Sequence, residues 1–195
     1  MTATRRTHRG STLVAAALCA LLAGVVYSNT LTSAFQFDDY LYVIDYCRAH
    51  SLESFLPPHG TRYLAYLTFA LNYRFFGLDV AGYHIVNLFI HIVNGVLVYA
   101  VASSIMRSPR LAKRELPEFH IALLAALLFT AHPVQTEAVT YISQRFASLA
   151  TLFYLLALAS YLKYRSDGAQ GAFRTILYVI ALLSAYAAQV TKEIS

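Results

Sequence analysis

The sequence has few charged residues. Asp, Glu, Lys and Arg make up only 13% of its 195 residues, whereas hydrophobic residues make up 58%. Soluble domains carry roughly a quarter charged residues. The shortage of charge therefore excludes an ordinary water-soluble domain and indicates an integral membrane protein.

Cysteine and recognisable metal-binding spacings are also scarce. The two cysteines are Cys19, in an apolar run, and Cys47, in a polar connection. They are not expected to meet, so the sequence excludes a disulfide framework and offers no thiol chemistry. No HxxxH or CxxC spacing defines a metal site. We therefore expect no cofactor, and a divalent metal has no support in the sequence.

The apolar residues fall into runs that are candidates for membrane-spanning helices. A helix rises ~1.5 Å per residue, so about 20 apolar residues cross the hydrocarbon core. Five candidate spans follow, at residues 11–28, 83–106, 119–131 with an optional extension, 146–164 and 174–190. We expect an all-α membrane protein of about five transmembrane helices, with a long first outer loop at 29–82. Arg5-Arg6 before an apolar run would also suit a cleaved signal peptide, but four further runs already favour a membrane protein.

Basic residues predict the orientation of these spans. They cluster before the first span and in alternate connections, at Arg5, Arg6, Arg9, Arg107, Arg110, Lys113, Arg114, Lys163, Arg165 and Arg174. Cytoplasmic loops retain positive charge, which predicts a cytoplasmic N-terminus and an outer loop on the opposite side. The net charge of +5 reflects this arrangement and gives no reason to expect a nucleic-acid partner.

Two adjacent carboxylates, Asp38 and Asp39, follow the first span closely. Their mutual repulsion can raise one pKa and create a base near neutral pH. The alternative is that they cap a helix beginning near Tyr40. The sequence leaves open which aspartate would act as the base.

The remainder of the outer loop predicts two short helices, at 52–56 and 61–76. In the second, Thr61, Ala65, Thr68 and Asn72 form a narrow polar stripe on a broadly apolar helix. This pattern suits a helix at the membrane interface, or equally an ordinary packed loop helix.

A polar stripe also follows the second span, at His84, Asn87, His91 and Asn94. Their spacing places them on one helix face that cannot face lipid. Hydrogen bonds between helices explain the last three. His84, at the outer end, is the member best placed to reach a substrate.

The third candidate span contains too few apolar residues to cross a ~30 Å core. Either its helix continues through Val134–Ile142, or the polar residues 132–137 lie below the membrane surface beside a cavity, which we favour. We expect substrate or lipid-phosphate binding from the charged and polar outer residues, namely Arg62, His84, His132, Glu137, Arg145, Lys192 and Glu193.

Several motifs together resemble one family. They are the acidic pair, Arg62 in Thr-Arg-Tyr-Leu-Ala-Tyr, the segment from Gly77 through Tyr83-His84 to Asn94, His132-Pro-Val-Gln-Thr-Glu137, and Thr191-Lys192-Glu193. The chain from Phe35 onward is similar to the tetratricopeptide-repeat-containing and other transmembrane O-mannosyltransferases and their bacterial relatives, in the GT-C superfamily of glycosyltransferases. Family members often have Arg-Pro where this chain has Arg62-Tyr63.

The resemblance implies a function. Such enzymes move a sugar from a polyprenyl-phosphate carrier to an extracytoplasmic acceptor, here a protein hydroxyl, and Asp38 or Asp39 would be the general base. It also implies a partial GT-C module spanning 1–195, with more helices and repeats to follow, and too incomplete to act alone. The setting would be a bacterial inner membrane with the active site on the periplasmic side. The alternatives are a polytopic transporter or lipid-handling protein, and a non-catalytic membrane anchor.

Overall fold

The computed structural model describes residues 2–46, 50–55, 60–114, 116–166 and 170–193, and in these ranges it contains helices and no strand. The long helices are α1 (Thr2–Val26), α3 (Val80–Met106), α4 (Glu118–Ala131), α6 (Arg145–Arg165) and α7 (Gly171–Thr191). The shorter helices are α2 (Tyr63–Phe76) and α5 (Gln135–Thr140). Single turns occur at η1 (Ser28–Thr32), η2 (Tyr40–Ile44, a π-helix), η4 (Glu53–Phe55), η5 (Ala112–Arg114) and η6 (Ile142–Gln144).

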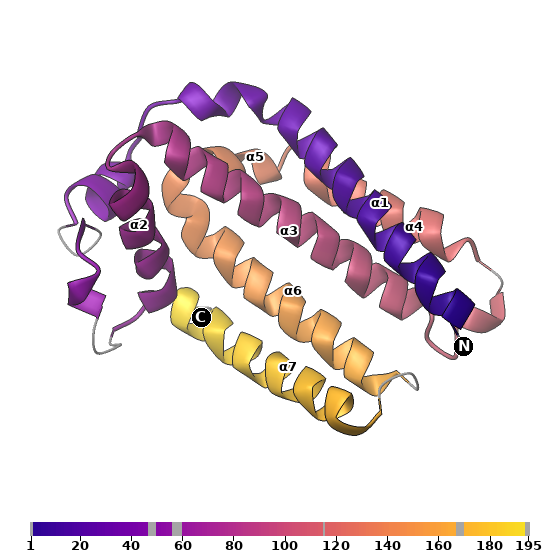
Figure 1. The fold of residues 1–195 in the computed structure, drawn as a ribbon. Helices are drawn as coiled ribbons and strands as arrows, with labels where there is room; N and C mark the ends of the chain where they lie inside the picture. Colours follow the sequence, from indigo (N-terminus) through magenta and orange to yellow (C-terminus); the bar gives the residue numbers. More distant parts are fainter. Residues whose placement is uncertain (1, 47–49, 56–59, 115, 167–169, 194–195) are drawn as a thin grey trace.

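Helix α3 lies at the centre of the bundle (Figure 1). Helices α1 and α4 pack on one side of it, α6 packs on the other, and α7 packs on α6. The helices α1, α4 and α7 end where α3 and α6 begin, and α2 and α5 lie at that same end. We call it the Asp38 end. The opposite end of the bundle, where the N-terminus of the chain lies, holds the α3–α4 and α6–α7 connections. We call it the N-terminal end. The basic residues of these connections therefore lie away from the acidic pair.

Within the described ranges, three helical segments have the length and hydropathy to cross a membrane: Val80–Met106, Ile142–Arg165 and Gly171–Thr191. The segment Gly10–Val26 of α1 and the whole of α4 are shorter apolar helices. The expected all-α membrane fold is therefore confirmed. The count of about five spans and the proposed boundaries stay predictions.

Small residues let α1, α3 and α4 approach closely. Every fourth residue along one face of α1 and of α4 is small and buried, namely Ala15, Cys19, Ala23, Ala122, Ala126 and Thr130. Gly95 of α3 lies against both faces. A Cβ atom at this glycine would lie 2.6 Å from Thr130 Oγ1 and 3.4 Å from Cys19 Sγ. Stripes of small residues at this spacing are a common way to bring membrane helices into contact.

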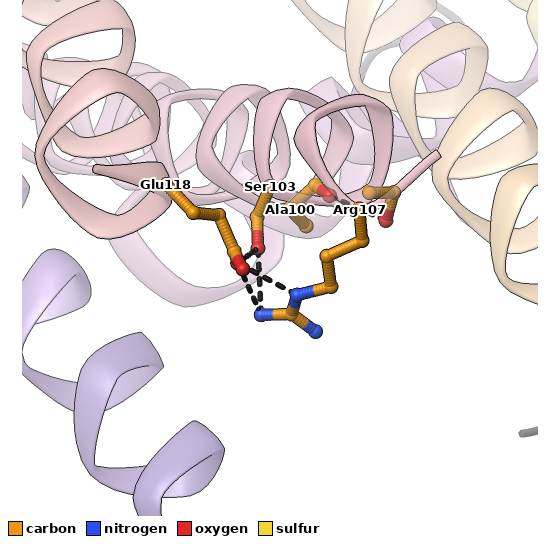
Figure 2. A network of polar contacts seen from close by, with 5 residues as sticks. Ala100, Ser103, Arg107 and Glu118 are labelled. Atoms are coloured by element: carbon orange, nitrogen blue, oxygen red, sulfur yellow. Dashed lines mark hydrogen bonds and ion pairs between the residues drawn. The ribbon is translucent and has the colours of Figure 1, made fainter. Parts of the chain in front are cut away.

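A polar network joins α3 to α4 at the N-terminal end (Figure 2). Arg107 Nε donates to Glu118 Oε1 at 2.6 Å, and Ser103 Oγ donates to the same oxygen at 2.7 Å. The Arg107 Nη2 atom lies 2.8 Å from Ser103 Oγ and 2.6 Å from Glu118 Oε1. Glu118 also lies in the first turn of α4, where the helix dipole favours a negative charge. The network fixes where the connection leaves α3 and enters α4.

A tight turn joins α2 to α3 at the Asp38 end. Gly77 adopts φ 58°, a left-handed conformation that costs glycine little. Asp79 then caps α3 by accepting a hydrogen bond from the Ala81 N–H at 3.2 Å. The Tyr83 hydroxyl donates to the Gly77 carbonyl at 3.0 Å. These contacts hold α2 across the beginning of α3.

Candidate functional site

The two aspartates occupy different environments. Asp39 is buried, at 2% exposure, whereas Asp38 is exposed. The residue before them, Phe37, has φ 43°, a strained conformation for a bulky side chain. A helical turn beginning at Asp38 then leads into η2. This turn directs one carboxylate into the protein and leaves the other at the surface.

Asp39 connects the outer loop to η6, the turn directly before α6. Its Oδ1 accepts a hydrogen bond from the Ser143 N–H at 2.7 Å, and its Oδ2 accepts one from the Gln36 N–H at 3.0 Å. The Asp39 N–H in turn donates to the Gln36 carbonyl at 2.9 Å. Both carboxylate oxygens thus bind backbone donors, so Asp39 fixes the position of its neighbour.

Asp38 is held through its backbone. Its N–H donates to the Tyr141 hydroxyl at 2.8 Å. Among the described residues, none donates a hydrogen bond to the Asp38 carboxylate. That carboxylate is therefore held in place by its main chain while its oxygens face solvent.

Arg145 is the centre of a buried polar network. The side chain has 0% exposure. Its Nε donates to Asn87 Oδ1 and its Nη1 to Asn72 Oδ1, both at 2.7 Å, and its Nη2 donates to the Tyr83 carbonyl at 3.0 Å. The guanidinium also stacks 4.5 Å from the Phe69 ring centre. Arg145 therefore joins α2, α3 and α6 and lies away from any solvent-accessible substrate.

The polar stripe of α3 is buried, as its spacing predicted. His84 Nε2 lies 2.9 Å from the Ser33 carbonyl, and His91 Nε2 lies 3.0 Å from the Thr130 carbonyl. Asn87 and Asn94 donate to the Ile142 and Ser148 carbonyls at 3.3 and 3.0 Å. All four side chains thus bind main-chain oxygens of neighbouring segments. His84, at 1% exposure, holds the outer loop against α3 and does not face solvent.

The polar segment after α4 breaks the helix. α4 is not extended past Ala131, because His132 is in an extended conformation and Pro133 has no N–H to continue the helix. The Thr130 carbonyl then accepts from His91 and from the Tyr27 hydroxyl, which lies at 3.4 Å. A separate helix, α5, follows.

The remaining predicted site residues lie at the Asp38 end. His132 and Glu137 are exposed, and Glu137 accepts a hydrogen bond from the Gln144 side chain at 3.2 Å. Half-buried Lys192 and exposed Glu193 follow α7, which packs against α2. The recessed cavity expected beside His132 stays a prediction.

Arg62 directly precedes α2 and lies beside two aromatic rings, those of Tyr42 in η2 and Phe146 in α6. It has φ 60°, and its guanidinium lies 5.7 Å from the Tyr42 ring centre and 5.3 Å from that of Phe146. Burial is the main cause of a raised pKa of the Tyr66 phenol, Tyr46 raises this pKa further, and Arg62 opposes the rise. Arg62 is thus a partly exposed cation near the acidic turn.

The expected start of α2 needed correction. The helix begins at Tyr63 rather than Thr61. The polar side of α2 faces inward, because Ala65 and Asn72 are buried and Asn72 binds Arg145. The exposed side carries Leu71, Phe75 and Phe76. The expected short helix at 52–56 is the turn η4, and residues 56–59 and Cys47 lie outside the described residues.

A cavity of about 560 Å³ lies between the outer loop and α2. Its walls are residues 50–53 and the face of α2 that carries Ala70, Tyr73 and Arg74. In the part of the chain that the structure describes, no three His, Cys, Asp or Glu side chains converge to hold a metal ion.

Sequence reasoning missed the partners that hold these groups. Asn72 was interpreted only as part of a stripe, and Tyr141 and Ser143 were not singled out. Ser143 and Asp39 are 104 residues apart in the chain, and no local pattern links such positions.

Comparison with known proteins identifies relatives along most of the chain. It is 32% identical to Protein O-mannosyl-transferase Tmtc1 of Drosophila melanogaster over 191 residues, which cover 90% of this chain and 20% of that protein. It is 32% identical to Tmtc2 of the same fly over 176 residues, covering 82% and 18%. It is 36% identical to human TMTC4 over 125 residues, covering 61% and 17%.

The chain thus spans about a fifth of the length of the curated relatives it matches. No family model matches the sequence, and no solved structure matches it.

Proposed function

The chain belongs by sequence to the family whose members are named protein O-mannosyl-transferases, and we propose that it takes part in transferring a sugar to a hydroxyl group of a protein. The observation that carries this proposal is the acidic pair. Asp39 is buried and bound at both oxygens, while Asp38 beside it is exposed. A fixed main chain with one free carboxylate is the arrangement that a general base requires.

The donor in this proposal is a sugar linked to polyprenyl phosphate. The acceptor oxygen forms a bond to the anomeric carbon, and its proton passes to the Asp38 carboxylate. The bond between the anomeric carbon and the phosphate oxygen breaks, and the electron pair leaves with the phosphate. A single displacement of this kind inverts the anomeric configuration.

The leaving phosphate is a stable anion and needs positive charge more than it needs a proton. Arg62 and Lys192 are the partly exposed cations at the Asp38 end, and we assign them to the phosphate. We assign exposed His132, Glu137 and Glu193 to binding of the sugar or the headgroup. Arg145 and His84 are buried, so we assign them to holding α2, α3 and the outer loop in place.

A lipid-linked donor fits the setting of this chain. Among the described residues, three helical segments are long and apolar enough to cross a bilayer. The acidic pair lies between α1 and α2, at the end of the bundle opposite the α3–α4 and α6–α7 connections. We propose that the Asp38 end faces the extracytoplasmic side and the N-terminus faces the cytoplasm. The proposed membrane is the bacterial inner membrane, on the basis of the resemblance to bacterial family members.

The test compares two donors of the same sugar. The full-length protein, reconstituted in liposomes, is given a peptide that contains Ser and Thr, together with polyprenyl-phosphate mannose or with GDP-mannose. We expect mannose on the peptide hydroxyl only with the lipid-linked donor, and in the inverted configuration. Transfer from GDP-mannose alone would contradict the proposed donor, and transfer from neither would contradict the proposed mannosyl transfer.

A further inference from the structure

The cavity of about 560 Å³ beside α2 has the size of a ligand site, because small-molecule sites commonly occupy about 300–1,000 Å³. One wall is the chain from His50 to Glu53. The other is the face of α2 with Ala70, Tyr73 and Arg74, which are spaced three and four residues apart on one side of the helix. Neither wall contains a residue assigned above to sugar transfer.

The wall formed by residues 50–53 is fixed to the turn that carries the aspartates. The His50 ring stacks on Tyr73 with ring centres 4.1 Å apart and planes 17° apart. His50 Nε2 lies 2.9 Å from the carbonyl of buried Val43, in η2. A second contact follows at η4, where the Tyr63 hydroxyl donates to the Phe55 carbonyl at 3.0 Å. The cavity and the acidic turn therefore form one connected structure.

Opposite charges line the two walls. Glu53 and Arg74 are both exposed, and within the described ranges neither forms an ion pair. A phosphate headgroup would lie near the Glu53 carboxylate, which repels it. A polypeptide suits both walls, because it offers main-chain donors and acceptors along its length and can place a basic side chain near Glu53 and an acidic one near Arg74.

The position of the cavity also suits a chain that continues to the proposed base. His50 of the cavity wall contacts the Val43 carbonyl, and Val43 lies five residues after Asp38, a helical rise of at most roughly 8 Å at ~1.5 Å per residue. An extended polypeptide covers such a distance with a few residues at ~3.3 Å each. A segment held in the cavity could thus present a nearby Ser or Thr hydroxyl to Asp38.

We propose that this cavity binds an extended polypeptide segment of the acceptor, close in sequence to the hydroxyl that receives the sugar. The proposal rests on the proposed function, because it assumes a protein acceptor. It assigns Glu53 and Arg74 to recognition of charged residues in that segment and Tyr73 to its apolar contacts.

The test measures docking without any sugar donor. The full-length protein carries the photo-crosslinker p-benzoylphenylalanine in place of Leu52, which lines the cavity, or in place of Leu182, exposed on α7, as the matched control. The probe is a short fluorescent peptide of Ala and Gly with single Thr, Lys and Asp residues. A second probe has Gln and Asn in place of Lys and Asp.

We expect saturable crosslinking of the charged probe at position 52 and none at position 182. Glu53→Gln and Arg74→Gln should each weaken the apparent affinity of the charged probe by about two- to fivefold, the effect of one solvated ion pair. Binding of the uncharged probe should not change. Equal binding of the charged probe by wild type and both variants, or crosslinking displaced by polyprenyl phosphate, would overturn the proposal.

Failure of the cavity proposal and failure of the proposed function are separate outcomes. If the variants transfer sugar with an unchanged KM for the acceptor peptide, the cavity proposal is wrong and the transferase proposal remains. If the charged probe docks at position 52 and no donor supports transfer, the docking site remains and the transferase proposal is wrong.

Discussion

Replacing Arg145 with alanine should destabilise the protein more than any exposed substitution. The guanidinium is fully buried and donates to four acceptors at 2.7–3.4 Å, the side chains of Asn72 and Asn87 and the carbonyls of Tyr83 and Thr68. Alanine leaves the two buried amide oxygens of Asn72 and Asn87 without this donor, and each unsatisfied group costs about 1–3 kcal/mol. Water that enters the space left by the side chain recovers part of this loss.

The expected cost is therefore about 3–5 kcal/mol, the amount typical of removing one partner from a buried charged network. In a cooperatively unfolding domain of 195 residues, such a loss lowers the Tm by roughly 10 °C. Thermal unfolding of the full-length protein in detergent, followed by the far-ultraviolet circular dichroism of its helices, measures the shift. Arg145→Lys should also destabilise, because a single ammonium cannot reproduce the planar fork that reaches α2 and α3 together.

Arg174→Ala is the matched control. Arg174 is exposed on α7, where its guanidinium lies 4.9 Å from the Tyr164 ring centre. Loss of such an exposed contact costs about 0.5–1 kcal/mol. If Arg145→Ala lowers the Tm by no more than Arg174→Ala does, then the buried network does not stabilise the Asp38 end.

Two further substitutions test the packing of the bundle. Gly95→Ala places a methyl group 2.6 Å from the Thr130 hydroxyl oxygen, so we expect the free energy of unfolding to fall by about 1–3 kcal/mol in the same assay. Gly24→Ala, with nothing within 4 Å, should be neutral or stabilising, and equal effects of the two substitutions would refute the close contact at Gly95. Arg107→Ala removes the ion pair with Glu118, whose two side chains are 38% and 31% exposed. The loss in free energy of unfolding should therefore stay near 1 kcal/mol or below and shrink in high salt, and a larger, salt-insensitive loss would contradict a solvent-screened ion pair.

The helical elements could be predicted because their signals are local. The runs of apolar residues predicted the positions of α1, α3, α4, α6 and α7, since burial in a helical bundle or bilayer requires such runs. The three- and four-residue spacing of the polar stripe on α3 predicted hydrogen bonds between helices for Asn87, His91 and Asn94. His84, which we expected to reach a substrate, instead binds the Ser33 carbonyl. Pro133 and the polar residues around it indicated a break after α4, although the sequence alone also permitted a continuous helix.

Which of Asp38 and Asp39 is buried could not be predicted. Two adjacent acidic residues look alike in the sequence, and the distinction depends on the Ser143 N–H, which only the tertiary fold brings to Asp39. The same reason applies to Arg145. Its charge and its position before an apolar run suggested an exposed residue that binds substrate or lipid phosphate. Its hydrogen-bond acceptors, however, are contributed by α2 and α3, more than fifty residues earlier in the chain.

If Asp38 is the base and Asp39 holds it in position, three Asp→Asn variants of the full-length protein should differ in sugar transfer and in stability. The measurement is the rate of sugar transfer from the lipid-linked donor to the acceptor peptide, with the Tm recorded for each variant. Asp79→Asn is the control, because Asn caps a helix about as well as Asp.

Asp38→Asn should reduce transfer by about 10²–10⁴-fold with an unchanged Tm. Asp39→Asn should lower the Tm, because the amide nitrogen cannot accept one of the two backbone hydrogen bonds, a loss of about 1.5–3 kcal/mol. Sugar transfer by Asp38→Asn at the wild-type rate would show that Asp38 is not the base.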